Sequence, residues 1–150
     1  MHQIGVIGSG SCEKETKKKA YELGKEIAEH GVLVCGGLGG VMKSASKGCK
    51  EAGGETIGIL PGDDISSANQ YIDHKIVTGL GEARNVVIVK SSDVLVSVEG
   101  GYGTLSEISL AKKLGKDVIG TAGGFSKELS KLGLIDYFSD PRKALKTALS

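Results

Sequence analysis

The chain has 150 residues, a length typical of one domain with a core of its own, and we expect residues 1–150 to form a single domain. Its net charge of +1 gives no overall field that would attract nucleic acid or a membrane surface, so we expect neither as a partner. No segment has the roughly 18 successive apolar residues of a membrane span. The first residues lack the pattern of a signal peptide, which predicts a cytoplasmic protein.

Short apolar runs alternate with segments of helical spacing in the first half of the chain. Strands are predicted at residues 4–7, 32–35 and 56–60, and helices over about 14–29 and 42–52. Residues 63–73 are polar and are expected to form a loop, followed by a short strand at 75–78. Glycine turns follow the first two strands, at residues 8–11 and 36–40.

The second half continues this alternation. A helix is predicted over 81–91 and a strand at 94–98, followed by a helix in which Leu105, Ile108, Ala111 and Leu114 fall three residues apart. A further strand is predicted at 117–121, and a short helix near 126–131. The last helix is expected to begin at Pro141, because proline suits the first helical position.

Strands separated by helices, each strand an unbroken apolar run, are typical of an α/β protein. We predict a Rossmann-like three-layer sandwich in which a parallel sheet is covered by helices on both faces. In such sheets ligands bind beyond the carboxyl ends of the strands. Glycine turns follow strands at Gly8, Gly36 and Gly100, so we expect all three at one edge of the sheet.

The third glycine turn lies within residues 99–107, Glu-Gly-Gly-Tyr-Gly-Thr-Leu-Ser-Glu. Here a strand turns into a helix, glycine lets the backbone approach a ligand closely, and the first N–H groups of the helix are free to bind an anion. A phosphate is the anion that we favour. The same residues also fit a capping box, in which Thr104 and Glu107 only close the helix end. Both interpretations remain open from these nine residues.

Two common nucleotide sites are not indicated. A dinucleotide site needs G-x-G-x-x-G after the first strand, but Glu13 stands where the third glycine belongs, and no acidic residue ends the second strand. No P-loop motif is present either. The three cysteines and three histidines show no ligand spacing, so we predict no metal site.

Arg84 is the second candidate site residue. It stands near the start of the helix that precedes the strand of the third glycine turn, so it is expected close to the same sheet edge. A guanidinium group there can bind phosphate through two parallel hydrogen bonds. By itself, Arg84 would fit a surface position on an amphipathic helix better than a binding site.

These residues resemble a known family. Residues 100–107, Gly-Gly-Tyr-Gly-Thr-Leu-Ser-Glu, are similar to the G-G-x-G-T-x-x-E core of the LOG (Lonely Guy), or "lysine decarboxylase-like", proteins. Arg84 and Asn85 fall where that family has Arg-Lys. Residues 4–9, 35–42 and 57–61 also match its first half, in the same order.

The resemblance implies a phosphoribohydrolase that cleaves the N-glycosidic bond of a nucleoside 5′-monophosphate to give free base and ribose 5-phosphate. It implies a homodimer or homotetramer, a small phosphorylated ligand and no required cofactor. Arg84 and Glu107 would be catalytic. The ligand would be bound by residues of the glycine turns and their surroundings: Gly8, Ser9, Gly36, Gly37, Gly39, Gly40, Met42, Asn85, Gly100, Gly101, Tyr102, Gly103 and Thr104.

Two positions differ from the hydrolases of that family. Glu99 stands where they have proline, and Asn85 replaces their lysine. Both differences resemble a sister branch, that of the molybdenum cofactor carrier protein. The alternative function is therefore a non-catalytic carrier that binds the molybdenum cofactor or a phosphorylated nucleotide.

Overall fold

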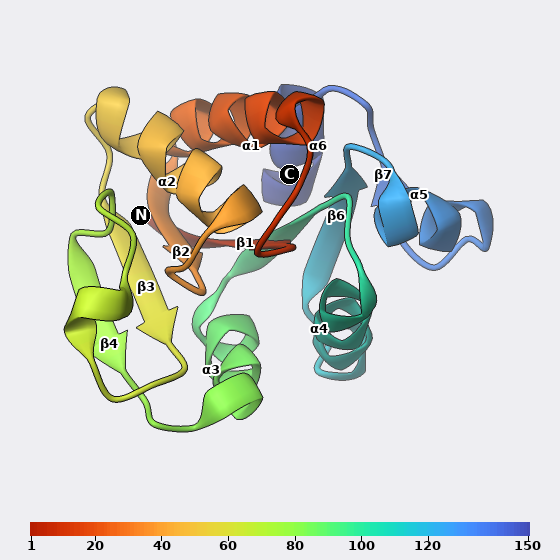
Figure 1. Cartoon of the computed structure of the whole chain (residues 1–150). Coiled ribbons are helices and arrows are strands. Elements are labelled where there is room, and N and C mark those ends of the chain that lie inside the picture. The colour runs from red at the N-terminus through yellow and green to blue at the C-terminus, as the bar shows by residue number, and fades with distance from the viewer.

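Figure 1 shows the computed structural model, which describes all of residues 1–150. The strands are β1 (His2–Gly8), β2 (Gly31–Cys35), β3 (Thr56–Leu60), β4 (His74–Val77), β5 (Val94–Val98), β6 (Asp117–Thr121) and β7 (Asp136–Tyr137). The helices are α1 (Lys14–Ile27), α2 (Gly40–Glu51), α3 (Arg84–Ser91), α4 (Tyr102–Lys113), α5 (Gly124–Lys131) and α6 (Pro141–Leu149). Two 3₁₀ turns, η1 (Ile65–Ser67) and η2 (Gly81–Ala83), lie in the connections on either side of β4.

All seven strands are parallel and form one sheet in the order β4-β3-β2-β1-β5-β6-β7. The chain builds the sheet outward from β1 to β4 and then returns to place β5 on the other side of β1. This reversal leaves a crevice between the loops that follow β1 and β5, which is where open α/β sheets bind their ligands.

Helices cover both faces of the sheet, as predicted. α1, α2 and α6 lie on one face, and α3 and α4 lie on the other (Figure 1). Alternate residues of a strand point to opposite faces, so Val94, Val96 and Val98 pack in the larger core cluster whereas Leu95 packs in the smaller one. The predicted Rossmann-like three-layer α/β class is confirmed.

Some local features differ from the predictions. Residues 134–138, for which no element was predicted, include the two-residue strand β7, and the polar loop at 63–73 contains η1. Leu114, the last residue of the predicted helical spacing, lies just after the end of α4 and is 41% exposed. None of the helices is both long and apolar enough to cross a membrane.

Candidate functional site

A cavity of about 370 Å³ opens at the crevice between β1 and β5. It is lined by the ends of the glycine turns and by the first turns of α3 and α4. Arg84 and Glu107 are the only charged residues in its wall. The lining residues are Val6, Ile7, Gly8, Ser9, Gly10, Gly36, Leu38, Met42, Arg84, Asn85, Ile88, Gly101, Tyr102, Gly103, Thr104 and Glu107.

A second cavity, of about 850 Å³, adjoins the first. Six residues line both cavities, so the two form a continuous depression: Leu38, Arg84, Asn85, Tyr102, Gly103 and Glu107. The second cavity adds apolar surface from Pro61, Val86 and Leu110. Arg84 and Glu107 thus stand where the two spaces meet.

Most residues that the sequence predicted for the site come together in the first cavity. Both proposed catalytic residues line it, together with Gly8, Ser9, Gly36, Met42, Asn85, Gly101, Tyr102, Gly103 and Thr104. Four predicted glycines, Gly37, Gly39, Gly40 and Gly100, are not in its wall.

These four glycines belong to the turns behind the wall, where three of them pack too closely for a side chain. A Cβ on Gly40 would lie 2.3 Å from the Ser9 carbonyl oxygen, and one on Gly100 would lie 2.7 Å from Cγ2 of Thr104. A Cβ on Gly37 would meet the Leu60 side chain at 2.7 Å. All three also have positive φ angles, which favour glycine. The turns that they form shape the cavity, and contact of the four glycines with a ligand stays a prediction.

The start of α4 decides between the two interpretations of the third glycine turn. The helix begins at Tyr102 with Gly101 as its N-cap, and no side chain caps it. Thr104 therefore lies inside the first helical turn, 3% exposed, and cannot be the cap of a capping box. The N–H groups of Tyr102, Gly103 and Thr104 have no acceptor within the chain, as the first turn of a helix leaves them. The capping-box interpretation is wrong.

Arg84 is half-buried and held by backbone oxygens. Its Nη1 donates to the carbonyl oxygens of Gly36, at 2.5 Å, and Ile59, at 2.7 Å. Its Nε is buried and has no acceptor within the chain. Because Nη1 is occupied and Nε is buried, Nη2 is the nitrogen of the guanidinium left for a ligand oxygen. Desolvation lowers the pKa of Arg84, although Glu107 opposes this effect, and the side chain stays charged.

Glu107 stands one turn after the start of α4 and faces the same cavity. It forms no ion pair with Arg84 within 4.0 Å, and no hydrogen bond within the chain engages its carboxylate. Desolvation by burial raises its pKa from 4.5 to about 7, and the charge of Arg84 reduces this rise. A carboxylate with a pKa near neutrality can accept or donate a proton under physiological conditions.

Comparison with known proteins identifies the family. The model of the SLOG cluster4 family matches residues 1–144. The chain belongs to the SLOG cluster4 family. An uncharacterized protein of Archaeoglobus fulgidus is 55% identical over 117 residues, which are 77% of each chain.

Two groups of relatives of this SLOG cluster4 protein have descriptive names. A probable cytokinin riboside 5′-monophosphate phosphoribohydrolase of Oryza sativa is 32% identical over 108 residues, which are 67% of this chain and 47% of that protein. The chain therefore spans about half the length of this plant relative. A molybdenum cofactor binding protein of Rippkaea orientalis has a similar structure, with a TM-score of 0.91 and 42% identity over 99% of this chain and 98% of that one. The molybdenum cofactor carrier protein of Chlamydomonas reinhardtii gives a TM-score of 0.87 and 41% identity over 99% of both chains.

Glu99, one of the two positions that differ from the hydrolases, is not among the lining residues of either cavity in this SLOG cluster4 protein. Its carboxylate accepts a hydrogen bond from Oγ1 of Thr16 on α1. Its carbonyl oxygen accepts from both the backbone N and the Oγ of Ser126, at 3.0 and 2.7 Å. Its φ angle of 57° is rare for a residue with a side chain. These bonds hold the entrance of the third glycine turn in place.

Sequence reasoning missed five residues of the wall: Val6, Ile7, Gly10, Leu38 and Ile88. Gly10 belongs to the first glycine turn, so its position in the Gly8-Ser-Gly10 run was an available signal. The other four are apolar residues that look like ordinary core positions, and nothing in the sequence distinguishes them.

Proposed function

We propose that this protein binds a nucleoside 5′-monophosphate, or a closely similar compound, and hydrolyses its N-glycosidic bond. The observation that carries the proposal is Glu107: a carboxylate free of hydrogen-bond partners in the chain, with a pKa of about 7, in a cavity that it shares with Arg84. The similarity to named phosphoribohydrolases supports the same reaction.

The phosphate would be bound at the third glycine turn. The free N–H groups of Tyr102, Gly103 and Thr104 point out at the start of α4, where the helix dipole also favours negative charge. Nη2 of Arg84, which forms no hydrogen bond within the chain, can donate to a further oxygen of the ligand. With the phosphate at the helix end, the sugar would lie beside Glu107 and the base would extend toward the second cavity.

The reaction adds water to C1′ of the ribose while the bond from C1′ to the base nitrogen breaks. The sugar develops positive charge in the transition state, as in other glycoside hydrolyses. Glu107 would take a proton from the attacking water, for which a pKa near the working pH is favourable. The base leaves with the electrons of the broken bond and takes up a proton from solvent.

Incubation with AMP tests the proposal. The purified protein should release adenine and ribose 5-phosphate, detected by chromatography, and Glu107→Gln should lower the rate by about 10²–10⁴-fold, the usual contribution of a positioned proton acceptor. Glutamine keeps the shape of the side chain, so a folded but inactive variant would assign the effect to the carboxylate. A wild-type rate no higher than that of Glu107→Gln would overturn the proposal.

Carriage of the molybdenum cofactor is the second candidate function. It is supported by the two structural neighbours with 41–42% identity over nearly the whole chain. The cavity wall contains no cysteine or histidine, so the chain would hold such a compound through its phosphate and ring and would leave the metal to the ligand itself. Calorimetry with the isolated cofactor should then give binding in both wild type and Glu107→Gln, and the compound should be recovered unchanged. Conversion of the compound, or no binding, would exclude this candidate.

A further inference from the structure

The segment at 61–73 connects β3 to β4 and lies beside the candidate site without forming part of either cavity, apart from Pro61. It contains η1, whose start is capped by Asp64 accepting from the backbone N of Ser66 at 2.8 Å. One residue of this segment, Asn69, contacts the second glycine turn, residues 36–40.

Asn69 makes three hydrogen bonds with its two side-chain atoms and its backbone N. The backbone N donates to the Gly37 carbonyl oxygen at 2.8 Å, and Nδ2 donates to the Leu38 carbonyl oxygen, also at 2.8 Å. The Oδ1 atom accepts from the backbone N of Tyr71 at 2.9 Å. The last bond orients the amide so that its NH₂ group points to Leu38.

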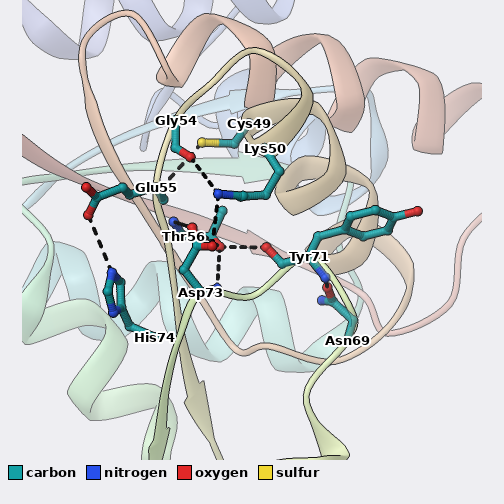
Figure 2. Close-up of polar contacts among 9 residues, drawn as sticks. All are labelled: Cys49, Lys50, Gly54, Glu55, Thr56, Asn69, Tyr71, Asp73 and His74. Carbon is teal, nitrogen blue, oxygen red and sulfur yellow. Dashed lines mark hydrogen bonds and ion pairs between the residues drawn. The ribbon is translucent and has the colours of Figure 1, made fainter.

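The base of the same segment is fastened independently of Asn69 (Figure 2). The Asp73 carboxylate accepts from the backbone N of Thr56 at 3.0 Å and from Nζ of Lys50 at 2.9 Å. Oγ1 of Thr56 donates to the Tyr71 carbonyl oxygen at 2.6 Å. The segment is thus held to β3 and α2, and the hydrogen bonds of Asn69 connect it to the second glycine turn.

The second glycine turn is therefore held from two sides. Nη1 of Arg84 binds the Gly36 carbonyl oxygen on one side, and Asn69 binds those of Gly37 and Leu38 on the other. Leu38 lines both cavities, as does Tyr102, so the two residues belong to the passage between the first cavity and the second. A flat heterocyclic ring that extends through this passage would contact the Leu38 side chain.

We propose that Asn69 is a positioning residue that fixes the second glycine turn and so places Leu38 against the heterocycle of the ligand. The role of Leu38 rests on the proposed function, because it assumes a ligand with its sugar phosphate in the first cavity and its ring extending toward the second. Asn69 itself touches neither cavity and acts only through the backbone of the turn. Its loss should reduce affinity for the ring and leave affinity for the sugar phosphate nearly unchanged.

The test compares Asn69→Ala and Asn69→Asp with Lys50→Met. The Lys50 variant removes one contact at the base of the segment, where the bonds of Thr56 to Asp73 and Tyr71 remain, and it leaves the turn untouched. Asn69→Asp keeps the acceptor for Tyr71 but replaces the donor to Leu38 by an oxygen, so it isolates the bond to Leu38.

Calorimetry with AMP and with ribose 5-phosphate gives the two affinities. Both Asn69 variants should bind AMP about tenfold more weakly, the effect of losing one net hydrogen bond, and ribose 5-phosphate within about twofold of wild type. Lys50→Met should bind both compounds like wild type.

Hydrogen exchange of the peptide containing residues 36–42 provides a measurement that needs no ligand. Exchange should be faster in both Asn69 variants and unchanged in Lys50→Met. Unchanged exchange in the Asn69 variants, or an equal loss of affinity for AMP and ribose 5-phosphate, would overturn the proposal. If the wild-type protein bound neither compound, the proposed function would fail, and the exchange result alone would decide whether Asn69 fixes the turn.

Discussion

Glu107 and Arg84 influence each other's charge across the cavity that they share. The desolvated carboxyl of Glu107 has a pKa of about 7, and this value would be higher still without the guanidinium of Arg84. Arg84 in turn is held by two backbone carbonyl oxygens, so its position does not depend on an ion pair with Glu107. The protonation of one residue can therefore be studied by changing the other.

The raised pKa of Glu107 makes stability depend on pH. The native protein binds this proton more tightly than the unfolded chain, so the associated stability is fully present below pH 4.5 and is lost as the pH rises through about 7. The loss is about 3 kcal/mol at most, from 1.36 kcal/mol for each pKa unit between 4.5 and 7. We predict that Glu107→Gln is more stable than wild type at pH 8 and that this advantage disappears at pH 4. Thermal unfolding at the two pH values measures it, and an equal difference at both would contradict the pKa.

Replacing Arg84 should change the titration of Glu107. In Arg84→Met the favourable charge is gone, so the pKa of Glu107 should rise above about 7. The variant should also lose about 1–3 kcal/mol of stability, because the carbonyl oxygens of Gly36 and Ile59 lose their donor. Carbon NMR of the Glu107 carboxyl gives its pKa directly. Arg84→Lys is the matched control, since it keeps the positive charge but cannot reproduce both hydrogen bonds. A pKa of Glu107 that did not rise in Arg84→Met would contradict an effect of the Arg84 charge on Glu107.

At the scale of elements, α1 and α2 approach each other closely because glycines lie at their contact. A Cβ on Gly24 of α1 would meet the Ala45 carbonyl oxygen at 1.9 Å, and one on Gly48 of α2 would meet the Tyr21 carbonyl oxygen at 2.1 Å. Both obstacles are backbone atoms, which cannot move without displacing a helix. Since α2 begins at the second glycine turn, the separation of these helices helps to place that turn.

We therefore predict that Gly24→Ala destabilises the protein by about 1–3 kcal/mol, the usual cost of an extra methyl group in a packed core, even though alanine favours helix formation. Chemical denaturation measures the change. Gly62→Ala is a suitable control, because no atom lies within 4 Å of a Cβ at that position, and its stability should stay close to that of wild type. A Gly24→Ala variant as stable as the control would show that the helices can separate without cost.

At the scale of the whole molecule, association is the property that we predict from the family resemblance. The edge strand β4 is exposed along its length, and Ile76 and Val77 on it are 46% and 41% exposed. Exposed apolar edges commonly take part in contacts between chains. We predict a homodimer or homotetramer in solution, and light scattering should give two or four times the 15.5 kDa of one chain. A mass of 15.5 kDa over the micromolar range would contradict this prediction.

The α/β class followed from the sequence, and so did most of the candidate site. The apolar runs at 4–7, 32–35, 56–60 and 94–98 all became parallel strands of the sheet, and the three glycine turns gathered at one edge. Parallel strands end on the same side, so turns that follow strands must meet there. Arg84 and Glu107 are 23 positions apart but line one cavity, because α3 and α4, which carry them, both begin at that edge. Leu38 and Ile88 were missed because an apolar residue in a cavity wall has the same sequence signal as one in the core.

The amino-acid sequence by itself determined the class of fold, the sheet edge at which the glycine turns meet and the two charged residues there, since periodicity and glycine content are local properties of the chain. Only the tertiary structure decided that Thr104 lies inside α4, that Nη1 of Arg84 binds backbone oxygens, and that the pKa of Glu107 rises to about 7. Each of these depends on where a helix starts or on how much water a side chain loses. Both are set by contacts between segments far apart in the sequence.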